Sequence, residues 1–244
     1  MKNSINFYGL LISVAAFAGL LISKSRAKLY AISENQIENA FFITLFTGIV
    51  GARSYHVIDK WSYYGRHMQE IFFIWQGGIA IYGALIGGFL GIWVFSKLAK
   101  LSLLKLLDCI VPSIALGQAI GRIGNYFNQE GFGPPTTLPW GIAIPSELRP
   151  AKYQDFEFFH PTFFYESILC LILFVILIAL TKKLVTRSGF LTAIYLVGYG
   201  GIRFFTETFR SDTALVFGVK TAYFLSFIFI VIGLVMLSKI RKRI

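Results

Sequence analysis

The sequence is poor in charged residues, cysteine and histidine. Charged residues make up 14% of its 244 residues and hydrophobic residues 56%, a balance that excludes an ordinary soluble domain and indicates a membrane protein. Cys109 and Cys170 each lie inside an apolar run and outside any paired motif, which excludes a disulfide framework and a thiolate metal site. His56, His67 and His160 lack metal-ligand spacing, so we expect no bound metal.

Acidic residues are also scarce, with 12 against 23 basic ones and a net charge of +11. In so apolar a chain the positions of the charges matter more than their sum, and we expect no nucleic-acid partner. Basic residues cluster after apolar runs, at 24–28, 97–105, 182–187 and 239–243. The positive-inside rule assigns these clusters to the cytoplasm, with the amino terminus outside and the carboxyl terminus inside.

Seven apolar runs approach the length that a bilayer requires. They cover residues 5–23, 40–57, 71–95, 103–120, 160–180, 190–208 and 222–237. The sequence therefore predicts an all-α integral membrane protein with seven transmembrane helices, forming a single polytopic membrane domain over residues 1–244. Five of the seven prolines fall within 134–150, a density that excludes a long helix. We expect a small irregular extracytoplasmic head at about 129–160, between spans four and five.

Two features of the runs have structural interpretations. The glycines of residues 77–88 favour close helix packing, with approach of a ligand to the backbone as the alternative. Asp108, near a basic helix end, is expected to form a structural pair or a cap.

Three arginines lie inside the apolar runs. Arg53, Arg122 and Arg203 fall in spans two, four and six, each nearer the outer end, and Glu166 and Glu207 fall at similar depth. Arg203 and Glu207 are four residues apart and can pair on one helix face. Two carboxylates leave one positive charge over, and a buried excess cation requires an anionic partner. Because the arginine fork fits phosphate, we expect a phospholipid headgroup just below the outer surface.

The stretch G-R-I-G-N-Y-F-N-Q-E-G-F-G, residues 121–133, resembles the signature of the bacterial phosphatidylglycerol–prolipoprotein diacylglyceryl transferase family. Further similar motifs, in the family's order and spacing, occupy residues 7–10, 51–55, 77–87, 160–166 and 199–210. The resemblance implies a transferase of the bacterial cytoplasmic (inner) membrane. Its substrates would be phosphatidylglycerol and the lipobox cysteine thiol in the signal peptide of a preprolipoprotein, and glycerol 1-phosphate would be released.

The resemblance also implies which residues act. The family's functional positions correspond to Tyr8, Arg122, Asn125, Asn128, Glu130, Gly133, Arg203, Glu207 and Arg210. We interpret Arg122, Arg203, Glu130, Glu207 and Tyr82 as catalytic, and Tyr8, Asn125, Asn128, Gly133, Arg210 and Arg53 as substrate-binding. The thiol proton would go to Glu130 or to Glu207, between which the sequence does not choose.

One position departs from the family pattern. Tyr82 stands where the family often has histidine, although tyrosine occurs in some of its branches. The resemblance implies no cofactor. Two alternatives remain at this point, a divergent paralogue that acts on another acceptor and a membrane transporter, since embedded charges and glycine-rich spans also occur in transporters.

Overall fold

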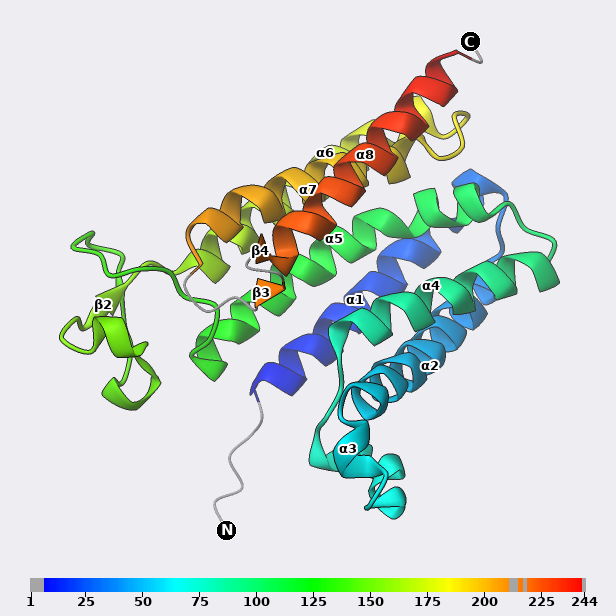
Figure 1. The fold of residues 1–244 in the computed structure, drawn as a ribbon. Helices are drawn as coiled ribbons and strands as arrows, with labels where there is room; N and C mark the ends of the chain where they lie inside the picture. Colours follow the sequence, from blue (N-terminus) through cyan, green and yellow to red (C-terminus); the bar gives the residue numbers. More distant parts are fainter. Residues whose placement is uncertain (1–6, 211–214, 217–218, 243–244) are drawn as a thin grey trace. The chain divides into compact units, whose positions relative to one another are not determined.

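The computed structural model describes residues 7–210, 215–216 and 219–242, so Arg243 of the last basic cluster lies outside the described residues. Its α-helices are α1 (Phe7–Ala27), α2 (Glu34–Asp59), α3 (Trp61–Tyr64), α4 (Ile81–Leu98), α5 (Leu103–Asn128), α6 (Thr162–Leu184), α7 (Phe190–Thr208) and α8 (Thr221–Arg241) (Figure 1). Short 3-10 helices are η1 (Lys28–Tyr30), η2 (Met68–Phe72), η3 (Ile74–Gln76), η4 (Ser146–Leu148) and η5 (Ala151–Tyr153). The strands are β1 (Ile142–Ala143), β2 (Phe158–Phe159), β3 (Leu215–Val216) and β4 (Val219–Lys220).

Six helices among the described residues are long and apolar enough to cross a membrane. They are α1 together with η1, α2, α4, α5, α6 and α8. The chain is therefore a multi-pass membrane protein of the all-α class. The expected sixth run does form a helix over its whole range, α7, but Arg203 and Glu207 lower its hydropathy, and it is not among these six.

The third apolar run differs from the prediction. We expected it to begin at residue 71, but the helix α4 begins only at Ile81, and η2 and η3 precede it. Gly77 and Gly78 have φ angles of 90° and 71°, in the left-handed region that a continuing helix cannot use. This pair of glycines ends the irregular segment and delays the helix.

The chain divides into two compact units. One unit is Lys24–Leu106, and the other combines α1 up to Ser23 with the chain from Leu107 onward. In the unit Lys24–Leu106, α2 and α4 pack along their length (Figure 1).

The contact between α2 and α4 depends on glycines. A Cβ on Gly83 would overlap the carbonyl oxygen of Gly51 and lie 2.6 Å from Cβ of Tyr55, and one on Gly87 would overlap the carbonyl oxygen of Thr47. Only glycine, which has no Cβ, lets the two backbones approach so closely. The prediction of close helix packing is confirmed for Gly83 and Gly87, whereas Gly77 and Gly78 precede the helix.

We expect Gly83→Ala to lower the free energy of unfolding by about 1–3 kcal/mol, as overpacking of a tight contact does. The matched control is Gly48→Ala on the same interface, whose Cβ would lie 3.6 Å from the carbonyl oxygen of Ala84, an ordinary contact. Thermal unfolding in detergent, followed by circular dichroism, measures both variants. Equal melting temperatures for the two variants would contradict the packing role.

The other unit is built on α5. Its first half packs on α1, where the hydroxyls of Ser23 and Ser113 are 2.8 Å apart. Its second half contacts α6, because the Ser167 hydroxyl donates to the carbonyl oxygen of Ala119 at 2.7 Å. The helices α6, α7 and α8 lie side by side (Figure 1).

Asp108 of α5 caps the start of α7. Its fully buried carboxylate accepts hydrogen bonds from the N–H of Gly189 at 2.6 Å and from both the N–H and the hydroxyl of Thr192, at 2.8 and 2.6 Å. A carboxylate at a helix amino terminus satisfies N–H groups that have no partner within the helix. The predicted capping role is confirmed.

A small region with its own core occupies residues 129–161, between α5 and α6. β1 pairs antiparallel with β2, with Ile142 opposite Phe159, and the buried side chains of Phe132, Ile144 and Phe159 form the core. Arg149 fixes one loop by donating to the carbonyl oxygens of Ile144 at 2.8 Å and Gln154 at 3.0 Å. The prolines leave room only for the 3-10 turns η4 and η5 between the strands.

Candidate active site

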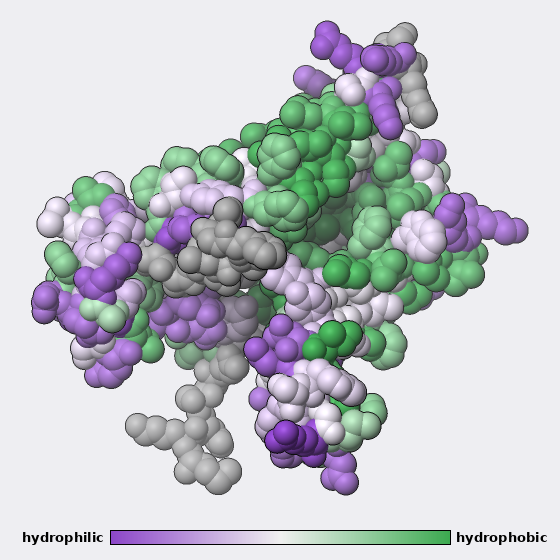
Figure 2. Space-filling view, in the orientation of Figure 1, coloured by the Kyte–Doolittle hydropathy of each residue, from purple (hydrophilic) through white to green (hydrophobic). Residues whose placement is uncertain are grey.

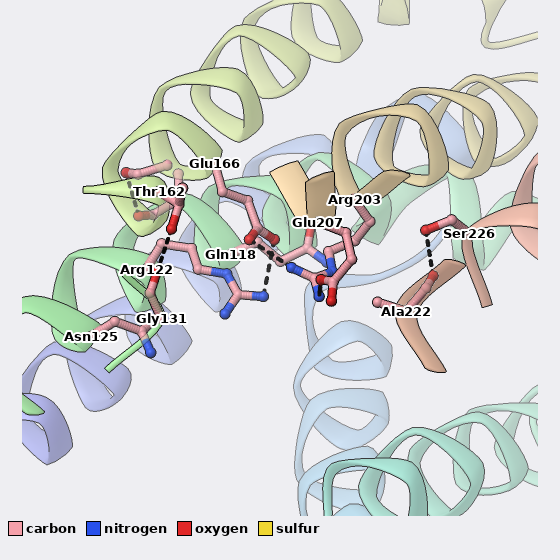
Figure 3. Close-up of polar contacts among 12 residues, drawn as sticks. Gln118, Arg122, Asn125, Gly131, Thr162, Glu166, Arg203, Glu207, Ala222 and Ser226 are labelled. Atoms are coloured by element: carbon pink, nitrogen blue, oxygen red, sulfur yellow. Dashed lines mark hydrogen bonds and ion pairs between the residues drawn. The ribbon is translucent and has the colours of Figure 1, made fainter. Parts of the chain in front are cut away.

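Glu166 lies between two of the three embedded arginines. One carboxylate oxygen is 2.9 Å from Nη2 of Arg122, and the other accepts a hydrogen bond from Nη1 of Arg203 at 3.0 Å (Figure 3). Nη2 of Arg203 also pairs with Glu207, which confirms the predicted pairing across one turn of α7. Both carboxylates are fully buried, whereas the Arg122 side chain keeps 24% of its surface exposed.

The helix registers bring these groups to one level. Arg122 lies six residues before the end of α5, Arg203 five before the end of α7, and Glu166 four after the start of α6. At a rise of 1.5 Å per residue, each is within about 9 Å of its helix end. The expected layer of charge near one set of helix ends is therefore present for these groups.

The charge balance differs from the expected surplus. Arg122 and Arg203 are matched here by Glu166 and Glu207, two cations against two carboxylates. Further positive charge comes from Lys220, the last residue of β4 just before α8, which the sequence did not single out. Its ammonium donates to the carbonyl oxygens of Glu207 at 2.8 Å and Arg210 at 2.6 Å.

A second polar group follows at the end of α5. The side-chain amides of Asn125 and Asn128 both donate to the same Glu130 oxygen, each at 3.1 Å. The helix ends between them and Glu130, where Gln129 has a φ of 55°, and this bend turns the carboxylate back onto the two amides. Three of the predicted site residues thus form one cluster.

Gly131 and Gly133 connect this cluster with α6 and α7. The Thr162 hydroxyl donates to the carbonyl oxygen of Gly131 at 2.6 Å, and a Cβ on Gly131 would lie 3.6 Å from the Arg210 guanidinium. Gly133 has no space for a side chain, because a Cβ would lie 2.6 Å from the carbonyl oxygen of Phe209. Arg210 and Gly133, both predicted site residues, therefore lie close to the Asn–Glu130 cluster.

Tyr8 belongs to the same unit through α1. A Cβ on Gly124 would lie 2.7 Å from the Tyr8 ring, so this glycine lets the ring pack against α5. In the sequence Gly124 lies between Arg122 and Asn125. The neighbouring Phe7 stacks on Phe127, with ring centroids 5.2 Å apart.

Arg53 and Tyr82 belong to the unit Lys24–Leu106. The expectation that Arg53 joins the anion-binding layer has no support in its contacts, since its guanidinium binds backbone carbonyls. It donates to the carbonyl oxygens of Ile71 at 2.8 Å, Gly77 at 2.8 Å, Gly78 at 2.9 Å and also Glu70. Arg53 thereby fixes the irregular segment before α4. Tyr82, in the first turn of α4, has its ring centroid 6.1 Å from that of Tyr55.

Glu166 is the residue whose importance the sequence understated. The sequence placed Glu166 at a depth similar to that of the arginines. Only the packing of α6 between α5 and α7 reveals that it contacts both Arg122 and Arg203. Tyr199, one turn before Arg203 on α7, also lies beside the Arg122 guanidinium. A buried carboxylate between two guanidinium groups fixes the spacing of Arg122 and Arg203.

Residues 1–239 match the family described as prolipoprotein diacylglyceryl transferase. Among similar proteins is the phosphatidylglycerol–prolipoprotein diacylglyceryl transferase of Prochlorococcus marinus subsp. pastoris, 39% identical over an alignment covering 98% of this chain and 90% of the relative. Proteins of the same name from Trichormus variabilis and Synechococcus elongatus are 41% and 39% identical. Their alignments cover 98% and 99% of this chain, and 88% and 86% of the relatives.

Proposed function

The chain belongs to the prolipoprotein diacylglyceryl transferase family, and on this basis we propose that it transfers the diacylglyceryl group of phosphatidylglycerol to the lipobox cysteine thiol of preprolipoproteins. The reaction releases glycerol 1-phosphate. The observation that carries this proposal within the structure is the convergence of Arg122 and Arg203 on the buried carboxylate of Glu166.

The proposed topology has seven crossings, with the amino terminus outside, the carboxyl terminus in the cytoplasm, and the region 129–160 as an extracytoplasmic head. Support for α7 as a crossing comes from its packing against α8. Gly200 approaches Ser226 while Gly233 approaches Ala193, so the two helices run antiparallel over most of their length. From the family resemblance we also propose the bacterial cytoplasmic (inner) membrane as its location.

In the proposed mechanism Arg122 and Arg203 bind the phosphate of phosphatidylglycerol. One carboxylate oxygen of Glu166 pairs with Arg122 and the other with Arg203, which fixes the spacing of the two guanidinium groups before the lipid binds. Charge placed in advance where negative charge develops is often the largest contribution to catalysis. Lys220 adds positive charge beside this pair, because its ammonium donates to the carbonyl oxygens of Glu207 and Arg210.

The chemical step is a displacement at carbon. The cysteine sulfur forms a bond to the diacylglycerol carbon that is esterified to the phosphate, and the bond between that carbon and the ester oxygen breaks. The departing phosphate oxygen keeps the electron pair, next to the two arginines. The thiol proton goes to Glu130 or Glu207, and the electropositive surroundings favour the thiolate.

The remaining site residues are assigned to binding. Asn125 and Asn128 orient Glu130 and supply neutral donors, and Gly133 keeps the chain close to α7 and α6. Tyr8 and Arg210 border this cluster as substrate-binding groups. Tyr82 and Arg53 belong to the unit Lys24–Leu106. For Tyr82 we keep the proposed role of orienting the phosphate or the thiol, and Arg53 would act by fixing the segment that precedes Tyr82.

The product assay tests this function. Purified protein in detergent receives phosphatidylglycerol and a lipobox peptide, and mass spectrometry measures the diacylglyceryl thioether and glycerol 1-phosphate. We expect the two products in equal amounts, and neither product from a peptide whose lipobox cysteine is replaced by serine.

Product formation on the serine peptide would instead indicate an enzyme with another acceptor. Flux of a solute into liposomes without any lipid turnover would indicate a transporter. Either result would exclude the proposed function.

A further inference from the structure

Two adjoining cavities lie where the turn before α7 meets the end of α8. The larger has a volume of about 500 Å³ and is lined by Leu237, Ser238, Arg241 and Lys242. The smaller, of about 370 Å³, is lined by Arg187, Phe190, Leu237 and Arg241. Because they share Leu237 and Arg241, we treat them as one groove, called here the α8 groove.

The antiparallel packing of α7 and α8 creates the α8 groove. Gly233 of α8 packs against Ala193 of α7, so the first turn of α7 faces the last turns of α8. Gly189, with a φ of 90°, reverses the chain between α6 and α7. The guanidinium carbon of Arg187, in this turn, lies 5.9 Å from the ring centroid of Phe190.

The α8 groove combines three cations with an apolar floor. Arg187, Arg241 and Lys242 supply the charge, and none of the residues that line the two cavities is acidic. Asp108 packs against the same turn, but it is fully buried and its oxygens accept from Gly189 and Thr192. The groove is therefore electropositive at its surface.

An exposed apolar face leads to the groove along α8. Val231, Leu234 and Val235 are 41%, 52% and 45% exposed. Figure 2 shows this hydrophobic surface continuing to the hydrophilic side chains at the carboxyl-terminal end of the helix. A ligand that matches both features has an anionic head and long apolar chains. Basic grooves between transmembrane helices at the cytoplasmic side bind such lipid headgroups.

We propose that the α8 groove binds the phosphate of an anionic phospholipid in the cytoplasmic leaflet, with its acyl chains along the apolar face of α8. The assignment to that leaflet depends on the proposed topology. The site is separate from the candidate active site, because Phe190 and Arg203 are 13 residues apart on α7, or about 20 Å along the helix. The bound lipid would anchor the α7–α8 pair rather than react.

Lipid binding by the whole purified protein tests the proposal. Native mass spectrometry in a non-ionic detergent counts bound phosphatidic acid, which has no glycerol headgroup to release, against phosphatidylcholine. We expect a preference for phosphatidic acid that falls about 30-fold in Arg187→Gln/Arg241→Gln, from the loss of two basic residues at a lipid headgroup. The control Lys97→Gln/Lys100→Gln removes two charges from the other unit and should keep the preference.

Three results would overturn the proposal. They are equal binding of phosphatidylcholine, an equal loss in the control variant, and complete displacement of the lipid by millimolar inorganic phosphate, which would indicate a soluble ligand. If the double variant does not fold, Arg241→Gln alone should lower binding about fivefold and Arg241→Lys should retain most of it. Transfer activity measured on the same samples separates this inference from the proposed function, since either can fail while the other holds.

Discussion

Replacing Arg203 with alanine is expected to lower kcat/KM for diacylglyceryl transfer by about 10²–10³-fold and to destabilise the protein as well. The loss of activity follows from removal of a preorganised cation at the departing phosphate. The loss of stability has a separate cause, since Glu207 and one oxygen of Glu166 would remain buried without their partner. Breaking such a buried pair costs about 3–5 kcal/mol.

Arg122→Ala is the matched comparison. It should lose activity to a similar extent, but with a smaller loss of stability, because Glu166 keeps Arg203 and the Arg122 side chain is partly exposed. Combining Arg203→Ala with Glu207→Gln should restore part of the melting temperature and none of the activity. Transfer assays and thermal unfolding in detergent give both readouts. Full activity in the Arg122 variant would exclude the phosphate-binding role.

Replacing Gly133 with alanine is expected to lower transfer about 10²-fold, the cost typical of a displacement of about 1 Å at an active site. The added methyl group would lie 2.6 Å from the carbonyl oxygen of Phe209 and 2.9 Å from Cβ of His160. The hydrogen bond from the Gly133 N–H to the carbonyl oxygen of His160, at 2.8 Å, holds these two segments together, so Gly133 cannot move away from the contact alone. The whole segment around Gly133 must therefore shift, and we expect Glu130 and Arg210 to shift with it.

The control for this prediction is Gly117→Ala in α5. No atom lies within 4 Å of the Cβ that this change adds, and alanine is the better helix former. We expect unchanged transfer and a gain in stability of about 0.5–1 kcal/mol. The same assay applied to both variants decides the matter. Wild-type activity in Gly133→Ala would mean that the contact with Phe209 tolerates a side chain.

Several elements followed from local sequence patterns. The range of α7 was predicted to the residue, because a basic turn precedes it and the apolar pattern stops at Thr208. The number of glycines in 77–88 favoured close helix packing over approach of a ligand, and the structure shows that the packing partner of α4 is α2. For Asp108 the sequence predicted a structural pair or a cap, and the structure shows the cap.

Other features could not be predicted because they depend on which segments meet. The predicted start of the third span, at residue 71, was wrong. An apolar run looks the same in the sequence whether or not its glycines adopt positive φ. Arg53 looked equivalent to Arg122 and Arg203 by its position in a span. Its role as a donor to carbonyls of the segment before α4 became visible only with the fold.

The sequence by itself determined that this chain is an α-helical membrane protein, and its 121–133 motif identified the family, because hydropathy and a long motif are local properties of the chain. Only the tertiary structure decided how the charges are shared. Glu166 is 37 residues from Arg203 and 44 from Arg122, and no local pattern records that α6 inserts its carboxylate between the two guanidinium groups. Ion pairing acts over a few ångströms in space, so it is determined by helix packing rather than by separation along the chain.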